Sequence, residues 1–189
     1  IKADADSIFV GNGAIEIIQA ALHRFAGKLI ALPIPTFSSY YEFIKRGSKI
    51  LKYQLLESNN YCLDIENFSE YLKDNAADTA IIINPNNQVV NYIPQKKIIS
   101  FLEKNRHLKL IIIDESFLHF AYEDDRLEII DNSDLVELFP NLILIKSMSK
   151  DFGIAGLRSG YGVMSAKRTS SLLSNGYLWN ISGLSNYFF

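Results

Sequence analysis

Short apolar runs alternate along this chain with stretches that have helical spacing. The apolar runs cover residues 8–10, 29–32, 49–53, 80–83, 110–113, 142–145 and 160–163. Strands buried on both faces appear as continuous apolar runs, and parallel strands need long crossovers, usually helices, between them. The alternation therefore predicts a three-layer α/β fold, with helices on both faces of a mostly parallel sheet of about seven strands.

The first predicted helix, residues 14–25, has the clearest spacing, because apolar residues recur about every 3.6 residues from Ile17 to Phe25. Pro94 lies where a proline opens a helix, here one that reaches residue 102. Pro33 and Pro35 interrupt the second apolar run, so their neighbourhood is predicted to be a loop. Further helices are expected at residues 40–46, 65–72, 134–138 and 166–174.

Length and composition exclude several classes of protein. The chain has 189 residues, of which 48% are apolar, so it can bury one sizeable core and we expect a single domain over residues 1–189. The net charge is −2 and no basic run is interleaved with aromatic residues, so nucleic acid is not an expected partner. No apolar run approaches the roughly 18 residues that span a bilayer, so we expect a cytoplasmic protein without a membrane partner. Cys62 is the only cysteine and the histidines lie far apart, so no metal site is predicted.

A lysine and an arginine follow the apolar run at residues 142–145. Ser147, Ser149 and Lys150 come first, and Arg158 follows eight residues after Lys150. In open α/β sheets the functional groups gather beyond the carboxyl ends of the strands. A partly desolvated lysine there can form a Schiff base with a carbonyl group or with pyridoxal phosphate, and the guanidinium and hydroxyl groups suit a phosphate. A single lysine beside serine is more often solvated surface, so this segment needs support from others.

Three more segments place polar groups after predicted strands. A Gly-Asn-Gly turn at residues 11–13 precedes a predicted helix. The unpaired amides of Gly13, Ala14 and Ile15 would then form an anion-binding site at the positive end of the helix dipole. Asp114 ends an aliphatic run with a carboxylate, and Asn87 ends an Asn-Pro-Asn-Asn turn. An aspartate in this position also resembles a Walker B segment that holds magnesium, but the G-x-x-x-x-G-K-[ST] loop that must accompany it does not occur in the sequence.

The order and spacing of these segments resemble the large domain of class I and II aminotransferases, which are fold-type-I pyridoxal-phosphate enzymes. The chain looks most like histidinol-phosphate aminotransferases and threonine-phosphate decarboxylases, and the resemblance runs nearly end to end. It implies that pyridoxal phosphate is joined to Lys150 as a Schiff base and that Asp114 bonds the protonated ring nitrogen. The resemblance assigns the cofactor phosphate to Gly13, Ala14, Ile15, Ser147, Ser149 and Arg158.

Three further positions carry over from the resembling enzymes. Asn87 matches an asparagine that donates to the phenolic oxygen of the cofactor, and Phe37 matches an aromatic ring over the pyridine face. The family loop reads Asn-Pro-x-Asn-Pro-Thr-Gly, whereas residues 84–90 lack its second proline and its glycine, which makes the position of Asn87 less constrained. Phe117 stands where such aminotransferases often have a tyrosine that also donates to the phenolic oxygen, so one donor is missing.

The resemblance implies a pyridoxal-phosphate-dependent aminotransferase that uses a small-molecule amino donor and a keto acid and works as a homodimer. Because the chain runs from Ile1 to Phe189, we expect a large-domain piece of a longer protein, without the N-terminal arm and C-terminal small domain of the family. A decarboxylase similar to threonine-phosphate decarboxylase is the first alternative. A Rossmann-type nucleotide-binding oxidoreductase is the second, although Glu16 replaces the third glycine of its motif. A cofactor-sensing domain of a transcription regulator is the third.

Overall fold

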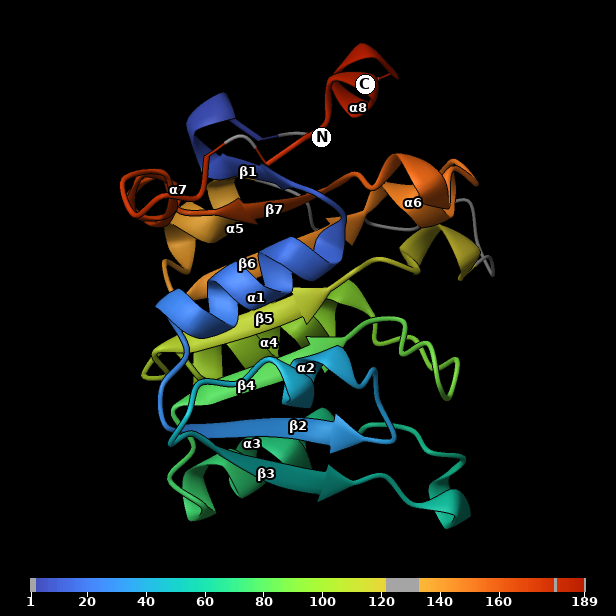
Figure 1. Ribbon diagram of the computed structural model, residues 1–189. Helices are drawn as coiled ribbons and strands as arrows, with labels where there is room; N and C mark the ends of the chain where they lie inside the picture. Colours follow the sequence, from blue (N-terminus) through green and yellow to red (C-terminus); the bar gives the residue numbers. More distant parts are fainter. Residues whose placement is uncertain (1–2, 122–132, 179, 189) are drawn as a thin grey trace.

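The computed structural model describes residues 3–121, 133–178 and 180–188 (Figure 1). The charged cluster at residues 123–126, for which the sequence predicts a solvated loop, lies outside the described residues, as does Trp179. Its neighbour Asn180, at a position where the resembling enzymes approach the substrate cleft, is described and donates to the Val10 carbonyl at 3.4 Å. None of the described helices is long and apolar enough to cross a membrane.

Within the described residues, seven strands form one mixed sheet. In space they follow the order β1-β7-β6-β5-β4-β2-β3 (Figure 1). Strands β3, β2, β4, β5 and β6 run parallel, whereas β7 is antiparallel to both β6 and β1. The predicted strands and the mostly parallel sheet are confirmed. The strand bounds are β1 (Ile8–Gly11), β2 (Leu29–Ile34), β3 (Lys49–Gln54), β4 (Thr79–Ile83), β5 (Leu110–Asp114), β6 (Leu142–Ser147) and β7 (Gly160–Met164).

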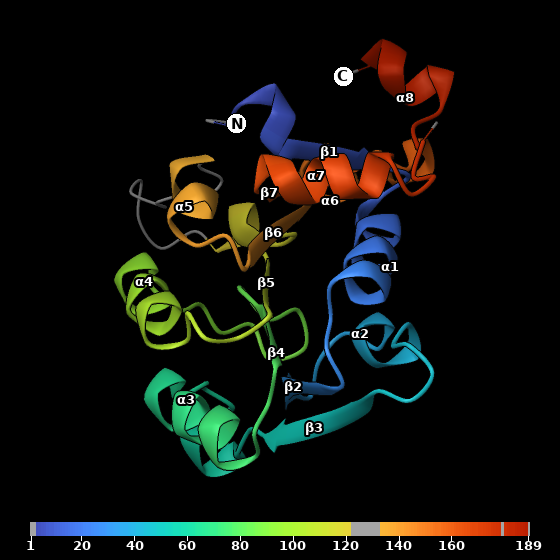
Figure 2. The same ribbon diagram turned by 90° about the vertical axis from the view of Figure 1, so that its left-hand side faces the viewer.

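Helices cover both faces of the sheet, which confirms the predicted three layers. Seen along the sheet, α1 and α2 lie on one face, and α3, α4 and α5 lie on the other (Figure 2). Short 3-10 turns include η3 (Leu118–Phe120) and η4 (Ala155–Leu157). The helix bounds are α1 (Ala14–Arg24), α2 (Ser39–Glu42), α3 (Ile65–Asp74), α4 (Gln95–Lys104), α5 (Ser133–Leu138), α6 (Met148–Asp151), α7 (Ala166–Leu173) and α8 (Gly183–Phe188).

The loop predicted around Pro33 is wrong, because β2 continues through this proline to Ile34. Strand β2 pairs with β3 along its whole length, but its pairing with β4 includes only Ile30 and Ala31. Pro33 therefore lies beyond the end of one ladder, where the missing N–H group is not needed. The strand keeps its direction toward the edge of the sheet where the site lies.

The helix predicted over residues 40–46 is a single turn, α2. The chain leaves the helical conformation at Phe43, whose φ is −100° and ψ is 19°. Phe43 and Ile44 both pack against the core, although neighbouring residues in a helix face different directions. Tertiary packing therefore ends this helix earlier than its sequence pattern suggests.

Two apolar cores, one on each face, explain why the central strands are apolar throughout. In β5, Ile111 and Ile113 belong to the core that α3 and α4 cover, and Ile112 belongs to the core that α1 covers. Successive side chains of a strand face opposite sides of the sheet, so both faces must be apolar. Asp114 continues the alternation on the α1 side, at the carboxyl end of the strand.

Candidate active site

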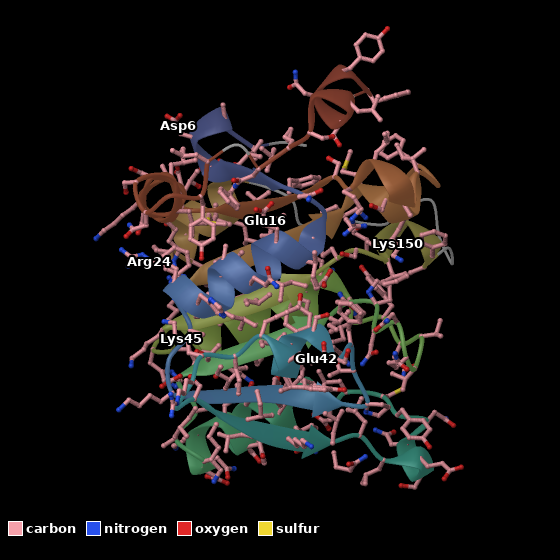
Figure 3. All side chains as sticks on the ribbon, viewed as in Figure 1. Asp6, Glu16, Arg24, Glu42, Lys45 and Lys150 are labelled. Atoms are coloured by element: carbon pink, nitrogen blue, oxygen red, sulfur yellow. The ribbon has the colours of Figure 1, made fainter. Side chains whose placement is uncertain are left out.

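A cavity of about 290 Å³ opens at the carboxyl ends of the parallel strands β4, β5 and β6. Figure 3 places Lys150 beyond these strand ends. The cavity collects segments that are far apart in the sequence, because parallel strands all end at the same edge of the sheet. Ten of the eleven predicted site residues line it, namely Ala14, Ile15, Phe37, Asn87, Asp114, Phe117, Ser147, Ser149, Lys150 and Arg158.

Gly13, the eleventh residue, lies behind the cavity wall and contacts Arg158. Its φ of 81° belongs to the left-handed region, and a Cβ atom built there would be 2.4 Å from Nη2 of Arg158. The amide of Gly13 donates to the carbonyl of Gly11 at 2.7 Å, so the prediction of a free amide at this residue is wrong. A tight turn uses that amide, which leaves Ala14 and Ile15 to present the amides of the first helical turn at the cavity.

Arg158, Ser147 and Ser149 all border the cavity. The Arg158 backbone is left-handed, with φ 56° and ψ 62°, and its Nη1 donates to the Ala155 carbonyl at 3.3 Å. Ser149 Oγ is buried and has no hydrogen-bond partner among the described residues. A ligand or a water molecule at this position would satisfy the hydroxyl. The guanidinium, the hydroxyl groups and the helix amides together suit a phosphate.

Asp114 also lines the cavity, is buried and is held by two donors. Its Oδ2 accepts from the Tyr40 hydroxyl at 2.7 Å, and its Oδ1 accepts from the Ser116 amide at 2.9 Å. Burial raises the pKa of Asp114, although hydrogen bonds from Ser116 and Tyr40 and the charge of Lys146 oppose this shift. Burial, followed by the Asp114 charge, also raises the pKa of Tyr40 well above its usual value. A cationic ring nitrogen beside Asp114 would stabilise the carboxylate in this desolvated position.

Tyr40 and Ser116 are contacts of Asp114 that the sequence did not predict. Tyr40 is fully buried and lies 74 residues from Asp114 along the chain, so no local pattern connects the two. Ser116 follows Asp114 closely, and its Oγ accepts from the Ser147 amide at 3.1 Å, which joins the ends of β5 and β6. The only sequence signal for Ser116 was its place two residues after the carboxylate.

Aromatic side chains border the Lys150 side of the cavity. Nζ of Lys150 lies 5.4 Å from the centre of the Phe117 ring, within the range of a cation–π contact. Phe37 lines the cavity from the chain that follows β2 and is partly exposed. Two flat apolar faces in one cavity suit a planar aromatic ligand.

The loop after β4 directs one of its asparagines to the cavity. Asn84 exchanges hydrogen bonds with the backbone of Ile93, and Asn86 donates to the Pro35 carbonyl at 3.1 Å. These two asparagines hold the loop, whereas Oδ1 of Asn87 is buried with no partner in the described part of the chain. This oxygen is an acceptor and could bind a donor group of a ligand, whereas donation to a phenolic oxygen would have to come from Nδ2 of Asn87.

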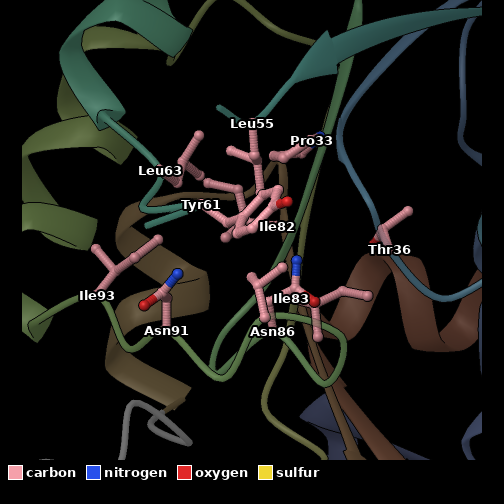
Figure 4. A pocket seen from close by; sticks show the side chains of 11 residues that line it. Pro33, Thr36, Leu55, Tyr61, Leu63, Ile82, Ile83, Asn86, Asn91 and Ile93 are labelled. Carbon is pink, nitrogen blue, oxygen red and sulfur yellow. The ribbon is translucent and has the colours of Figure 1, made fainter. Parts of the chain in front are cut away.

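The absence of the family's glycine from this loop affects the backbone conformation at residue 90. Val90 occupies the glycine position and adopts a φ of 56°, which is unfavourable for a β-branched residue. The turn still forms, because the Val90 amide donates to the Asn86 carbonyl at 2.8 Å and Asn91 donates to the Asn60 carbonyl at 3.0 Å. Behind the loop lies a much smaller cavity of about 20 Å³, bordered by Tyr61, Asn86 and Asn91 (Figure 4). A cavity of this size holds little more than one water molecule, so it is not a candidate site for an organic ligand.

The residues present fit pyridoxal phosphate. Possible phosphate donors, a buried carboxylate and a lysine all border the same cavity. The unpartnered Ser149 and Asn87 oxygens add two polar atoms that a ligand could satisfy. The volume is near the lower end of the roughly 300–1,000 Å³ typical of ligand pockets.

Comparison with known proteins agrees with this geometry. The model of the family "Aminotransferase class I and II" matches residues 1–187. An L-serine phosphate decarboxylase of Campylobacter jejuni is 51% identical over 188 residues, which cover 100% of this chain and 48% of that protein. A histidinol-phosphate aminotransferase of Thermoanaerobacter pseudethanolicus is 32% identical over 160 residues, which cover 83% of this chain and 42% of that protein.

A solved structure is also similar to this chain. The structure of a decarboxylase from Sulfurospirillum multivorans superposes with a TM-score of 0.89 at 43% identity and covers 98% of this chain and 52% of that one. The chain thus spans about half the length of the relatives that it matches. By sequence and by fold, the chain belongs to the class I and II aminotransferase family of pyridoxal-phosphate-dependent enzymes.

Proposed function

We propose that this chain is the pyridoxal-phosphate-binding large domain of a decarboxylase that acts on a phosphorylated amino acid of the L-serine phosphate type. Relatives that are 51% and 43% identical are named L-serine phosphate decarboxylases, whereas the histidinol-phosphate aminotransferases reach 32%. A decarboxylase therefore replaces the aminotransferase, which the resemblance implied, as the favoured function. The family match over residues 1–187 argues against a nucleotide-binding oxidoreductase.

The observation that carries the proposal is that Lys150, Asp114 and the phosphate donors around Arg158 border one cavity. When bound, pyridoxal phosphate supplies an electron sink that accepts the pair left when a bond at the substrate α-carbon breaks. Arg158, Ser147, Ser149 and the helix amides would hold the phosphate, with the guanidinium as the strongest single donor.

Asp114 would hold a proton at the ring nitrogen. Its carboxylate is already oriented by Tyr40 and Ser116, so little reorganisation is needed when a cationic partner binds. Phe37 would cover the ring face and exclude water, and Asn87 would donate to the phenolic oxygen.

Lys150 would form the covalent link to the cofactor and then move a proton. In decarboxylation the bond from the α-carbon to the carboxyl group breaks, carbon dioxide leaves, and a proton must reach the α-carbon. Nζ of Lys150 is the candidate donor of that proton, because it borders the cavity beside the Phe117 ring and an ammonium can donate, whereas the guanidinium of Arg158 is not deprotonated in proteins. We expect the groups that bind the substrate carboxylate to lie outside this chain. We also expect the complete protein to form a homodimer.

A second candidate is transamination, which the relationship to the histidinol-phosphate aminotransferases favours. The same cofactor-binding residues would serve both reactions, and the bond aligned with the cofactor's π-system decides between them. Transamination would also require a keto acid as acceptor.

The test uses the complete protein with pyridoxal phosphate and O-phospho-L-serine. We expect carbon dioxide and O-phosphoethanolamine in equal amounts, with no keto acid required. Keto acid formation without carbon dioxide would instead establish transamination. Lys150→Ala should abolish the visible absorbance of the bound cofactor, whereas Lys167→Ala, on the exposed side of α7, should leave it unchanged. A Lys150→Ala variant that keeps the absorbance would refute the role of this lysine.

A further inference from the structure

We infer that Lys146, Asp151 and His119 form a positioning network behind the cavity, which holds the segments carrying Lys150 and Phe117 in place. None of the three was among the predicted site residues. The inference rests on the role proposed for Lys150.

The network centres on a buried ammonium group. Nζ of Lys146 donates to the Glu115 carbonyl at 3.0 Å and lies 3.1 Å from Oδ2 of Asp151. The same carboxylate oxygen lies 2.7 Å from Nδ1 of His119. The Lys146 and Asp151 side chains are only 8% and 11% exposed, against 43% for His119, so water screens the ion pair little.

The network lies on the opposite side of the sheet from the cavity. Along β6, Leu144 belongs to the core beneath α3 and α4, whereas Ile145 belongs to the core beneath α1. Ser147 shares the side of Ile145 and lines the cavity, so Lys146 faces the other way. Lys146 therefore supports the cavity wall from behind.

Each contact of the network fixes the position of a segment that carries a cavity residue. Asp151 directly follows Lys150 in α6, which has only four residues and little stability of its own. His119 lies in η3, two residues after Phe117. The carboxylate of Asp151 thus joins α6, η3 and the end of β6 at one point. Lys150 and Phe117, which face each other across 5.4 Å, are held from behind by the same oxygen atom.

The proton arrangement favours His119 as a donor. The ammonium of Lys146 can only donate hydrogen bonds. Nδ1 of His119, which lies 3.2 Å from it, could accept from this ammonium only if Nδ1 carried no proton. The contact of 2.7 Å with Asp151 is shorter and requires a proton on Nδ1. Asp151 Oδ2 therefore accepts from both Lys146 and His119, and the 3.2 Å approach of the two nitrogens follows from this shared acceptor.

Stability alone does not account for this arrangement. Buried ion pairs are often no more stabilising than apolar residues of similar size. Oδ1 of Asp151 is buried and has no hydrogen-bond partner within the described ranges, which adds a cost. The Lys146 charge also opposes the rise in the pKa of Asp114, so the network acts electrostatically on a third cavity residue.

The test compares His119→Ala with His119→Asn in the complete protein. Asparagine keeps an N–H donor near the position of Nδ1, whereas alanine removes it. Without added cofactor, we expect His119→Ala to speed hydrogen exchange in residues 147–151 about tenfold, and His119→Asn to restore it to within about twofold of wild type. The affinity for pyridoxal phosphate and its visible circular dichroism should follow the same order. Equal exchange and equal circular dichroism in all three proteins would overturn the inference.

Asp151→Asn should have a larger effect than His119→Ala, because it leaves the buried ammonium without its counter-ion. Asp78→Asn is the matched control, since Asp78 accepts from the Lys28 amide at the other end of the sheet. It should lower global stability without selectively speeding exchange in residues 147–151. Lys150→Ala separates the two proposals. If that variant keeps the cofactor absorbance, the proposed function fails, whereas normal exchange in His119→Ala refutes only the network.

Discussion

The hydroxyl group of Tyr40 donates to Oδ2 of Asp114 across 2.7 Å, and both side chains are buried. Tyr40 comes from α2 and Asp114 from the end of β5, so the bond joins a helix on one face of the sheet to the edge where the cavity opens. It orients the carboxylate that would meet the cofactor ring. Burial raises the pKa of Asp114, and the hydrogen bond from Tyr40 is one of the interactions that oppose this rise.

Replacing Tyr40 with phenylalanine should weaken both the fold and the cofactor site. The change removes one of the two described donors of the buried carboxylate and should cost about 1–3 kcal/mol of unfolding free energy. It should also raise the pKa of Asp114 further and lower the affinity for pyridoxal phosphate. Urea unfolding and a cofactor titration at neutral pH measure both effects. Tyr71→Phe is the control, because its hydroxyl makes a solvent-exposed bond to the Lys52 carbonyl.

Asp114 should make the cofactor-free protein lose stability as pH rises. Its folded-state pKa is above the usual value of 3.8, so the folded protein binds more protons than the unfolded chain between those two values. The free energy of unfolding therefore falls with increasing pH across that interval and this contribution then levels off. Asp114→Asn should remove this slope and gain relative stability toward neutral pH. Unfolding titrations between about pH 4 and 8 would show it, and parallel curves for the two proteins would contradict it.

Gly13→Ala should damage the phosphate end of the cavity. The new Cβ would lie 2.4 Å from Nη2 of Arg158 and would force the guanidinium away. We expect the affinity for pyridoxal phosphate to fall between about tenfold and a hundredfold, as for the loss of a charge-assisted hydrogen bond. Gly47→Ala separates the two causes, since Gly47 has a similar φ of 89° but nothing within 4 Å of a Cβ. The control should lose stability and retain cofactor affinity. An equal loss of affinity in both variants would point to backbone strain instead.

Phe117→Tyr should change how the bound cofactor titrates. A tyrosine hydroxyl at this position could donate to the phenolic oxygen and stabilise its charged form. We expect the midpoint of the visible absorbance titration to move to lower pH by roughly one unit. Phe120→Tyr provides the control, because the Phe120 ring lies 6.2 Å from that of Phe117 and is largely exposed. An unchanged midpoint in Phe117→Tyr would show that this position does not reach the phenolic oxygen.

The sequence predicted the strands, the three layers and the positions that meet at the cavity. These predictions succeed because they depend on local patterns. An apolar run at 110–113 requires burial on both faces, and a carboxylate directly after it must lie at the edge of the sheet. The same reasoning predicted that Lys150 lies near that edge, because it follows the apolar run at residues 142–145. The roles of the site residues stay predictions, since their placement at one cavity does not test their chemistry.

Tertiary structure decided the contacts between residues far apart in the chain. Tyr40 reaches Asp114 across 74 positions, and Lys146 reaches Glu115 across 31. Pro33 fits inside a strand only because the ladder with β4 ends before it. Such contacts depend on how strands and helices are arranged in three dimensions, and one sequence contains no local pattern that reports this arrangement.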